Sequence, residues 1–484
     1  MSEIVAGERR LSPEALEERA NRAAGAFARL GVVAGDRVAV ALRNRPEFLE
    51  ATAAAGRLRA PVVTVPWRSK SGEVDYLVED SGARLLLTEP DGAGPSTEVP
   101  VLRAGDAWEA ALAAEDAGPA PGWADPPYPE FQYYTSGTTG RPKRVDRPVS
   151  PDPAIRARGS REYAAFWGLH HPDGVHLACG PLYHTAPCAY AHYAVLLGQR
   201  VVLMDGFDPE ECLRLIQDEG VTWTHMVPIN FIRILALPEE VLRRYDLSSI
   251  RRVLHAAAPC PVEVKRRVLD LFPAGTVWEY YGATEGLATV ISPEEWLSKP
   301  GSVGRAARGL TVKVLGEDGL ELGPGEVGLV YISPMGGTRF AYAGAPEKTA
   351  ETWRGDLYTV GDMGFLDADG YLFLTDRKQD LIISGGANVY PAEVEAVLFG
   401  HPAVADVAVI GVPDDEWGES VKAIVQPRGE LDPGELIAFA RERLAHYKCP
   451  RTVDLVDALP RDPNGKLQKR ELRDPYWAGR ERKI

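Results

Sequence analysis

The sequence predicts an α/β fold with a large N-terminal domain and a small α+β C-terminal domain. Helix and strand signals alternate through most of the chain, which is typical of parallel α/β layers. The 484 residues exceed what one hydrophobic core usually serves, so we expect at least two domains. Between about residues 313 and 373 the helical signals give way to short strands with Gly and Pro turns, which predicts a distorted small β subdomain within the large domain.

The N-terminal elements follow from local signals. Ser12-Pro13-Glu14 combines a cap, a proline in the first turn and an acid near the positive helix end, so we expect a helix from there to about Gly31. The alternation continues with a strand at 37–42, a helix at 46–55, a strand at 61–65, a helix at 72–80 and a strand at 83–87. The segment 91–129 is rich in Ala, Pro and Gly and predicts a loose connector.

A second α/β series and a compact tail follow. The series has predicted strands at 174–179, 200–204, 222–227 and 252–255. The tail has a predicted helix from Pro391, strands at 404–412 and 421–425, a helix at 433–444 and a strand at 452–456. A charged stretch at 377–380 separates two apolar strands and is typical of a hinge, so we place the domains at 1–377 and 378–484.

Composition and charge exclude several classes of partner. The net charge of −15 argues against a nucleic acid or an anionic membrane surface. The five cysteines are scattered without metal-ligand spacing, as is typical of reduced thiols in a cytosolic protein. The N-terminal residues MSEIVAGERR lack the apolar segment of a signal peptide, and no apolar run reaches the length of a membrane span. We therefore expect a soluble cytoplasmic protein without a membrane span.

The segment YTSGTTGRPK at 134–143 is the strongest single motif. Its glycines let the backbone approach a ligand closely, and its N–H groups and hydroxyls can surround a polyphosphate. It is not a Walker loop, because Arg-Pro separates Gly140 from Lys143 and no Ser or Thr follows the lysine. Taken alone, the segment could instead be a polar surface turn.

Five further segments carry residues suited to nucleotide chemistry: 280–285, 358–362, 376–380, 384–388 and 459–467. Asp362 is suited to accepting two hydrogen bonds from a ribose diol, and Lys466 follows a turn close to the C-terminus. Each residue also has a plainer interpretation. Tyr281 can be a core aromatic, Asp362 a turn cap and Lys466 a solvated lysine.

In this order and at these separations, the six segments resemble those of the adenylate-forming superfamily, which includes acyl-CoA synthetases, peptide-synthetase adenylation domains and firefly luciferase. The resemblance is greatest to bacterial fatty-acid and related carboxylate–CoA ligases, through PLYH at 181–184, HAAAPCP at 255–261 and ISGGANVYPAE at 383–393. It extends from about Leu11 to Trp477.

The resemblance implies an ATP site. Glu285 would bind Mg²⁺ and Thr284 would contact the α-phosphate. Lys466, a compact charge on a flexible stem, would bridge the α-phosphate and the carboxylate during catalysis. The implied ATP-binding residues are Thr135, Ser136, Gly137, Thr138, Thr139 and Lys143 for the β- and γ-phosphates, Ala257, Ala258, Tyr280, Tyr281 and Gly282 around adenine, and Asp362 and Arg377 at the ribose.

The resemblance also implies an acid pocket and a path for a thiol. The implied acyl-pocket residues are Tyr183, His184, Ile229, His255, Ala256 and Gly286. Gly385 and Gly386 would leave room for a pantetheine arm. The C-terminal domain would be mobile and swing about a hinge that we align with Gln379, withdrawing the lysine. Arg144 stands where the family commonly has glycine, and we expect its side chain to turn to solvent.

The implied function is an ATP-dependent carboxylic acid–CoA ligase that forms acyl-CoA, AMP and pyrophosphate through an acyl-adenylate. ATP, Mg²⁺ and coenzyme A are the implied cofactors and co-substrates, and a fatty or aryl acid the implied substrate. Two enzymatic alternatives use another acceptor: a carrier-protein thiol, or nitrite activation toward an aryl amine as in a diazotising enzyme. A third alternative is a catalytically silent nucleotide-binding protein. A homodimer is also compatible with the sequence.

Overall fold

The computed structural model describes residues 2–92, 94, 96, 98–119, 122–124, 127–135, 142–461 and 466–478. The chain forms two compact units. The first contains residues up to Met226 with Arg233–Leu254 and Thr338–Ala350, and the second contains Val227–Ile232, His255–Gly337 and the residues from Glu351 onward. The predicted division into 1–377 and 378–484 stays a prediction. No helix within the described ranges is long and apolar enough to cross a bilayer.

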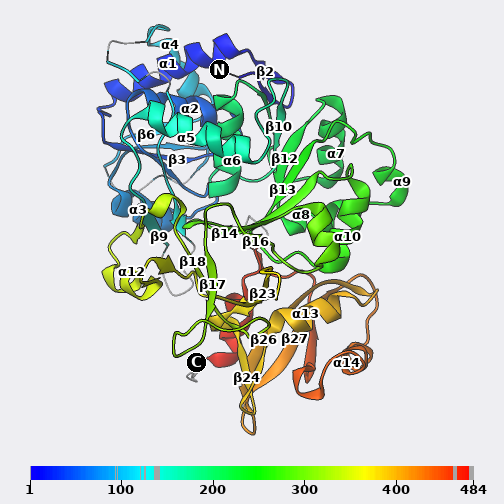
Figure 1. The fold of residues 1–484 in the computed structure, drawn as a ribbon. Helices are drawn as coiled ribbons and strands as arrows, with labels where there is room; N and C mark the ends of the chain where they lie inside the picture. Colours follow the sequence, from blue (N-terminus) through cyan, green and yellow to red (C-terminus); the bar gives the residue numbers. More distant parts are fainter. Residues whose placement is uncertain are drawn as a thin grey trace. The chain divides into compact units, whose positions relative to one another are not determined.

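A wholly parallel sheet forms one layer of the first unit. Its strand order is β6-β5-β3-β4-β7, with β3 Arg37–Ala41, β4 Val62–Thr64, β5 Ala83–Thr88, β6 Val101–Arg103 and β7 Phe131–Gln132. One face packs against α3 (Ser71–Ser81) through Val74, Leu77 and Val78. Helices α1 (Pro13–Arg29) and α2 (Pro46–Arg57) lie on the other face (Figure 1). The alternating side chains of its strands therefore serve two cores.

The first unit also contains six consecutive strands of a second sheet, in the order β13-β12-β10-β11-β1-β2. Its strands are β1 Ile4–Ala6, β2 Arg9–Leu11, β10 Val175–Ala178, β11 Arg200–Leu203, β12 Trp223–Met226 and β13 Arg252–His255. The pair β1–β2 is antiparallel, whereas β1, β10, β11 and β12 run parallel. Its accompanying helices are α5 Pro153–Phe166, α6 Thr185–Leu196, α7 Pro209–Asp218 and α9 Glu239–Leu242. A small antiparallel sheet joins β8 (Tyr134–Thr135), β9 (Lys143–Asp146) and β19 (Ala341–Tyr342).

The second unit begins with antiparallel strands. Strands β14 (Val277–Ala283), β15 (Gly286–Ile291) and β16 (Arg305–Ala306) pair in this order beside α10 (Val262–Leu271) and α11 (Pro293–Ser298). A further antiparallel sheet has the order β20-β21-β18-β22-β23, with β17 also on β18. Its strands are β17 Val312–Leu315, β18 Gly328–Ile332, β20 Trp353–Arg354, β21 Leu357–Tyr358, β22 Asp362–Leu366 and β23 Leu372–Arg377. These are the short strands that the sequence predicts between 313 and 373.

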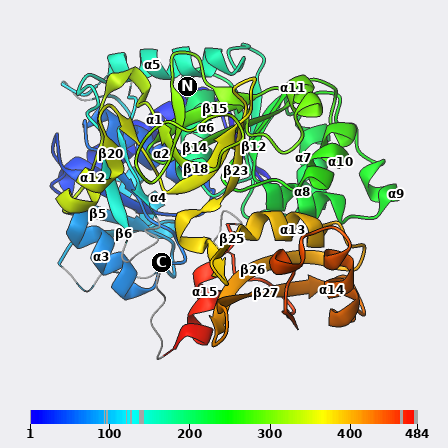
Figure 2. The same cartoon turned by 60° about the horizontal axis from the view of Figure 1, so that its bottom comes forward.

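The C-terminal part of the second unit is built around a long hairpin, β26 (Val404–Asp414) and β27 (Gly418–Pro427). Strand β24 (Ile382–Ser384) with β25 (Ala387–Val389), and strand β28 (Thr452–Leu455), complete its sheet. Val407 and Val409 share a core with α13 (Pro391–Phe399) and α14 (Pro433–Arg441), whereas Ala408 and Ile410 pack with Leu472 of α15 (Lys469–Arg473). Strand alternation thus places α13 and α14 on one face and α15 on the other (Figure 2).

The predicted α/β layers and nearly all predicted elements are confirmed, but the loose connector at 91–129 is wrong in part. Within it lie β6 and α4 (Asp106–Ala113). Helix α4 begins after Gly105, which has a φ of 85°. Its Trp108 is fully buried, and the Nε1 of Trp108 donates to Glu50 at 2.7 Å. Contacts with distant residues therefore stabilise α4, and these have no local sequence signal.

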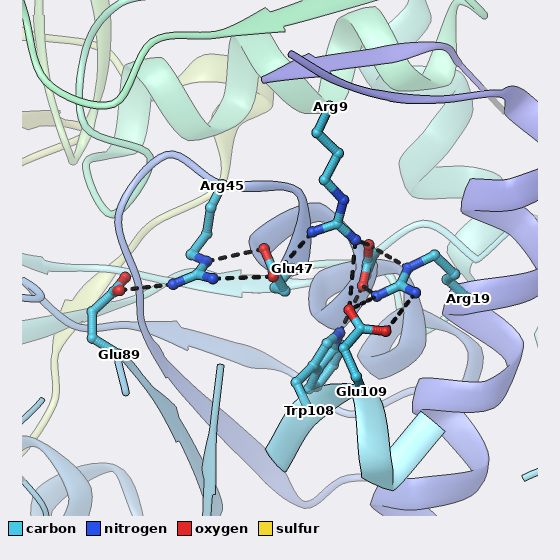
Figure 3. Close-up of polar contacts among 8 residues, drawn as sticks. Arg9, Arg19, Arg45, Glu47, Glu89, Trp108 and Glu109 are labelled. Carbon is cyan, nitrogen blue, oxygen red and sulfur yellow. Dashed lines mark hydrogen bonds and ion pairs between the residues drawn. The ribbon is translucent and has the colours of Figure 1, made fainter. Parts of the chain in front are cut away.

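A network of arginines and glutamates around a buried carboxylate joins β2, α1, α2 and α4 in the first unit (Figure 3). Its centre is Glu50, whose side chain is 0% exposed and lies 2.7 Å from the Nε of Arg19. Arg9 approaches the same carboxylate at 3.6 Å, and Arg19 also binds Glu109 at 2.6 Å. Burying a carboxylate is costly unless it is paired and hydrogen-bonded, and here it has both kinds of partner.

Replacing Glu50 by alanine should lower the free energy of unfolding by about 3 kcal/mol, because the Trp108 N–H and part of the Arg19 charge lose a buried partner. The measurement is the shift of the denaturant midpoint followed by Trp fluorescence. Glu18→Ala removes an exposed ion pair with Arg22 on the same helix and is the control, with an expected effect below about 0.5 kcal/mol. Equal shifts for both variants would contradict a special role for the buried network.

Candidate active site

The strands that flank the predicted phosphate loop pair with each other in the first unit. Thr135 of β8 lies opposite Lys143 of β9, and the Oγ1 of Thr135 donates to the Lys143 carbonyl at 3.3 Å. Helix α3 holds both flanks, because Tyr134 donates to Asp80 at 2.6 Å and Tyr76 donates to the Pro142 carbonyl at 2.7 Å. The predicted phosphate-binding residues between the two strands, Ser136, Gly137, Thr138 and Thr139, lie outside the described residues.

Arg144 does not turn to solvent, so that expectation is wrong. Its side chain is only 12% exposed. The Nε of Arg144 donates to Asp146 at 2.6 Å, and a second guanidinium nitrogen donates to the other carboxylate oxygen at 3.2 Å. A bidentate pair of this kind is geometrically specific. Asp146, on the same strand, therefore holds the guanidinium group beside β9.

Three of the predicted nucleotide-binding residues meet in the second unit. Asp362 of β22 and Arg377 of β23 lie opposite each other in the strand register, with 3.3 Å between the Arg377 Nε and the Asp362 Oδ1. The hydroxyl of Tyr281, on β14, donates to the Asp362 Oδ2 at 2.6 Å. Burial and the neighbouring Asp362 charge hold the pKa of Tyr281 well above its usual value, so the phenol stays a neutral donor. The Tyr281 residue is 8% exposed.

The turn between β14 and β15 depends on two glycines. A Cβ on Gly282 would lie 2.6 Å from the Gly286 carbonyl oxygen, and a Cβ on Gly286 would lie 2.8 Å from the Tyr358 hydroxyl. The strand register also shifts between Tyr281 and Gly282. A larger residue at 282 would therefore force the two strands apart, and one at 286 would displace the Tyr358 side chain. The turn presents Thr284 and Glu285, both partly exposed.

Glu285 fits a magnesium ion that is held jointly with phosphates. Within the described ranges, no group of three or more His, Cys, Asp or Glu side chains is placed to hold a metal ion. Mg²⁺ usually keeps several waters and binds through one or two carboxylates together with substrate phosphates. A single accessible carboxylate on a glycine turn is consistent with that chemistry, whereas an all-protein metal cage is not what this turn offers.

The segment after β13 contains a backbone conformation that non-glycine residues rarely adopt. Ala257 has a φ of 77°, and only one other described non-glycine residue, Arg59, has a positive φ. Ala256 is buried, whereas Ala257 is exposed and Ala258 is partly exposed. Strained residues cluster at ligand sites because surrounding structure must enforce them. The strain thus lies within the segment that the resemblance implies for adenine.

The predicted acyl-pocket residues are divided between the two units. Tyr183 and His184 belong to the first, where their rings are 4.3 Å apart and His184 is the residue before α6. Burial lowers the pKa of His184 to about 3, so the imidazole is neutral at physiological pH. Ile229, His255, Ala256 and Gly286 belong to the second unit. There the His255 ring lies edge-on to Phe231, a residue of α8 (Pro228–Leu235), at 5.2 Å.

Residues around the predicted hinge form an ionic network that the sequence did not predict. Gln379 lies in a short 3-10 helix, Lys378–Asp380. Arg473 of α15 donates to the Gln379 carbonyl at 3.2 Å and to Asp380 at 3.0 Å. Lys469, also in α15, lies 2.9 Å from Glu395 and 3.5 Å from Asp376. In the sequence, the only sign of this network is the run of charged residues just after Lys466. Such a run is also typical of a solvent-exposed helix.

The second glycine loop and the predicted catalytic lysine are both among the described residues. Gly385 and Gly386 have φ values of 58° and 81°, and a Cβ on Gly385 would lie 2.4 Å from the Trp417 ring. Gly386 has open space around it. Lys466 is partly buried and follows directly on residues 462–465, which lie outside the described part. The bridge between Arg461 and Leu467 brings the two sides of that segment together.

Comparisons with known proteins define the class. The family model described as AMP-binding enzyme matches residues 2–339, and the AMP-binding enzyme C-terminal domain matches 393–466. A fatty acid–[acyl-carrier-protein] ligase, ScoC, of Streptomyces coeruleorubidus is 35% identical, over 98% of this chain and 93% of that protein. A feruloyl-CoA synthase of an Amycolatopsis species is 36% identical, over 95% of this chain and 92% of that protein. The ATP-bound crystal structure of MatB from Rhodopseudomonas palustris superposes with a TM-score of 0.84 at 28% identity, over 98% and 96%.

The chain therefore belongs to the family of AMP-binding enzymes, within the adenylate-forming superfamily. Its reaction class is that of the AMP-forming carboxylic acid–thiol ligases, as the sequence predicts. The alternative of a silent nucleotide-binding protein has no support among these relatives, which are named as ligases and synthases.

Proposed function

We propose that this enzyme activates a fatty or aryl carboxylic acid with MgATP and transfers the acyl group to coenzyme A. A carboxylate oxygen attacks the α-phosphorus, the bond to pyrophosphate breaks, and an acyl-adenylate forms. A thiol sulfur then attacks the acyl carbon, and AMP leaves. The single observation that carries the proposal is the cluster of Tyr281, Asp362 and Arg377, which supplies a carboxylate and a guanidinium group suited to a ribose diol beside an aromatic ring.

The other predicted residues have matching roles in this proposal. Glu285 binds Mg²⁺, which supplies charge neutralisation at the phosphates, while Thr284 contacts the α-phosphate and Lys466 neutralises charge that develops there. Thr135 and Lys143, with the four residues 136–139, hold the β- and γ-phosphates. Residues 1–377 bind both substrates, and residues 378–484 move about Gln379 between the two steps. The five free cysteines support a cytoplasmic location.

A carrier-protein thiol is the second candidate acceptor. The relative ScoC, at 35% identity, is named for the acyl-carrier protein and not for coenzyme A. Both acceptors present a thiol on a flexible arm, so the same two half-reactions apply. Gly385 and Gly386 carry no side chains, and Gly386 has open space around it, so the loop leaves room for either arm. Nitrite activation toward an aryl amine remains the alternative that uses no thiol.

The test is ATP-dependent pyrophosphate release across a panel of fatty, aryl and amino acids and nitrite, each with and without coenzyme A. We expect release with one class of acid, and an acyl-CoA by mass spectrometry only when coenzyme A is present. Pyrophosphate release without a CoA thioester would indicate that the acceptor is a carrier-protein thiol or an amine, and not coenzyme A. No release with any acid would overturn the proposal.

Replacing Asp362 by alanine should raise the KM for ATP about 10- to 100-fold, because charge-assisted hydrogen bonds of this type contribute about 1.5–3 kcal/mol each. Steady-state pyrophosphate release at varied ATP measures this effect. Tyr281→Phe removes only the hydroxyl that donates to Asp362 and keeps the ring, so it is the matched control, with a smaller rise in KM. An unchanged KM in Asp362→Ala would exclude Asp362 from the ribose site.

A further inference from the structure

A buried cluster of three titratable side chains lies in the second unit, and one of them, His255, is also a predicted acyl-pocket residue. Lys265 of α10, His255 at the end of β13 and Glu279 of β14 are 0%, 0% and 5% exposed. The Nζ of Lys265 donates to the Glu279 Oε2 at 3.0 Å and is also hydrogen-bonded to the His255 Nε2. The His255 Nε2 and the Glu279 Oε2 are 3.5 Å apart. Lys265 therefore joins two strands from the interior.

The lysine can satisfy both partners at once. An ammonium group has only donors, and the Lys265 Nζ lies within hydrogen-bond distance of the His255 ring and of the Glu279 carboxylate. Two further groups face the cluster. The Lys265 Nζ lies 5.6 Å from the centre of the Trp296 ring, and the nearby Cys260 is a neutral thiol because burial raises its pKa. Burial raises the pKa of the Glu279 carboxyl, and the Lys265 ammonium at 3.0 Å opposes that rise.

The positions of the two partners in the chain connect this cluster to the nucleotide. His255 directly precedes Ala256–Ala258, the segment with the strained Ala257. Glu279 comes two residues before Tyr281, whose hydroxyl binds Asp362. One side chain from α10 is therefore bonded to a residue beside each of the two segments that the resemblance implies for adenine.

Stability alone does not call for an ion pair at this place. The neighbouring core positions of α10 are Val264 and Val268, and an apolar side chain at 265 would continue that core. Replacing a buried ion pair with apolar residues of similar volume is often neutral or stabilising. Unlike apolar contacts, the hydrogen bonds of the pair are directional, so they fix the separation of the two backbone segments that carry His255 and Glu279.

We propose that Lys265 is a positioning residue for adenine: through His255 and Glu279 it holds the Ala256–Ala258 segment and the Tyr281 strand at the spacing that the nucleotide base requires. This inference rests on the proposed function. It predicts that loss of Lys265 weakens ATP binding more than it slows the reaction of bound substrates, because Lys265 touches neither the reacting atoms nor the phosphates.

The test uses the full-length enzyme with three variants: Lys265→Met, the double variant Lys265→Met/Glu279→Met, and Lys422→Met as control. The single variant leaves Glu279 as an unpaired buried charge and is expected to lose stability. The double variant removes both charges together, so its melting temperature should return toward that of the wild type. Lys422 forms a 2.6 Å ion pair with Asp454 in the same unit, between β27 and β28, so its variant reports the loss of an unrelated pair.

The readouts are the melting temperature and separate values of KM for ATP and kcat from pyrophosphate release. The expected result is a KM for ATP about 10-fold higher in the double variant, with kcat within about 3-fold and with no change in Lys422→Met. A double variant with normal stability and a normal KM would overturn the inference and leave the cluster purely structural. Absence of pyrophosphate release in the wild type would instead reject the proposed function, so the two failures are distinguishable.

Discussion

Replacing Lys466 by alanine should lower the rate of acyl-adenylate formation by at least about 100-fold. Removing one donor that stabilises charge developing in a transition state typically costs 10²- to 10³-fold in rate. Lys466 suits this role because its charge is compact and its stem is flexible. Its exposure is partial, and it directly precedes Leu467, which forms a bridge with Arg461.

The two half-reactions separate this effect from a loss of fold. Pyrophosphate release from acid and ATP measures the first step, and thioester formation from supplied acyl-adenylate measures the second. Lys466→Ala should lose the first step and keep the second within a few-fold, because the thiol attack does not need the lysine. Equal loss of both steps would contradict a role confined to adenylation, and full retention of the first would exclude Lys466 from catalysis.

Much of the fold was predictable because its signals are local. The hydroxyl of Ser12 accepts the Ala15 N–H at 3.1 Å, so the predicted cap begins α1 as expected. Strands β26 and β27 show the alternation that the sequence predicts, with Val407 and Ala408 in different cores. Such features depend on residues a few positions apart, so capping residues and the period of apolar residues predict them from the sequence alone.

Features that depend on distant partners were not predictable in this way. Trp108 stabilises α4 through Glu50, which lies 58 residues earlier in the chain. Lys469 of α15 is mostly buried and lies 2.9 Å from Glu395 and 3.5 Å from Asp376, which are far away in the chain. Lys265, in the sequence VKRR, resembles an exposed helix residue and is fully buried. In each case a charged or polar group is buried because a partner elsewhere in the fold compensates the cost.

The candidate site shows the same division. Asp362, Arg377 and Tyr281 were predicted from motifs by resemblance, and the structure brings all three into contact. The residues that position them carry no comparable motif. Lys469 and Arg473 surround the predicted hinge from α15, and each acts through charges far away in the sequence. The motifs therefore predicted the residues that are proposed to touch the substrate. The residues that hold them in place could be identified only from the three-dimensional structure.

Replacing Gly386 by tryptophan should lower the rate of thioester formation by about 100-fold or more, while acyl-adenylate formation continues. The loop has open space at Gly386, where no atom lies within 4 Å of a Cβ built on it, so a bulky side chain there would fill the path proposed for the pantetheine arm. At Gly385, in contrast, a Cβ would meet Trp417 at 2.4 Å, and any substitution would disturb packing.

Gly386→Ala is the matched control for backbone strain. Gly386 has a φ of 81°, so alanine and tryptophan pay the same conformational cost of about 1–2 kcal/mol, but only tryptophan adds bulk. Acyl-CoA formation from supplied acyl-adenylate, compared with pyrophosphate release, measures the two steps for both variants. If alanine and tryptophan reduce thioester formation equally, backbone conformation and not blockage is responsible. If tryptophan leaves thioester formation intact, the thiol reaches the acyl group by a route that does not pass Gly386.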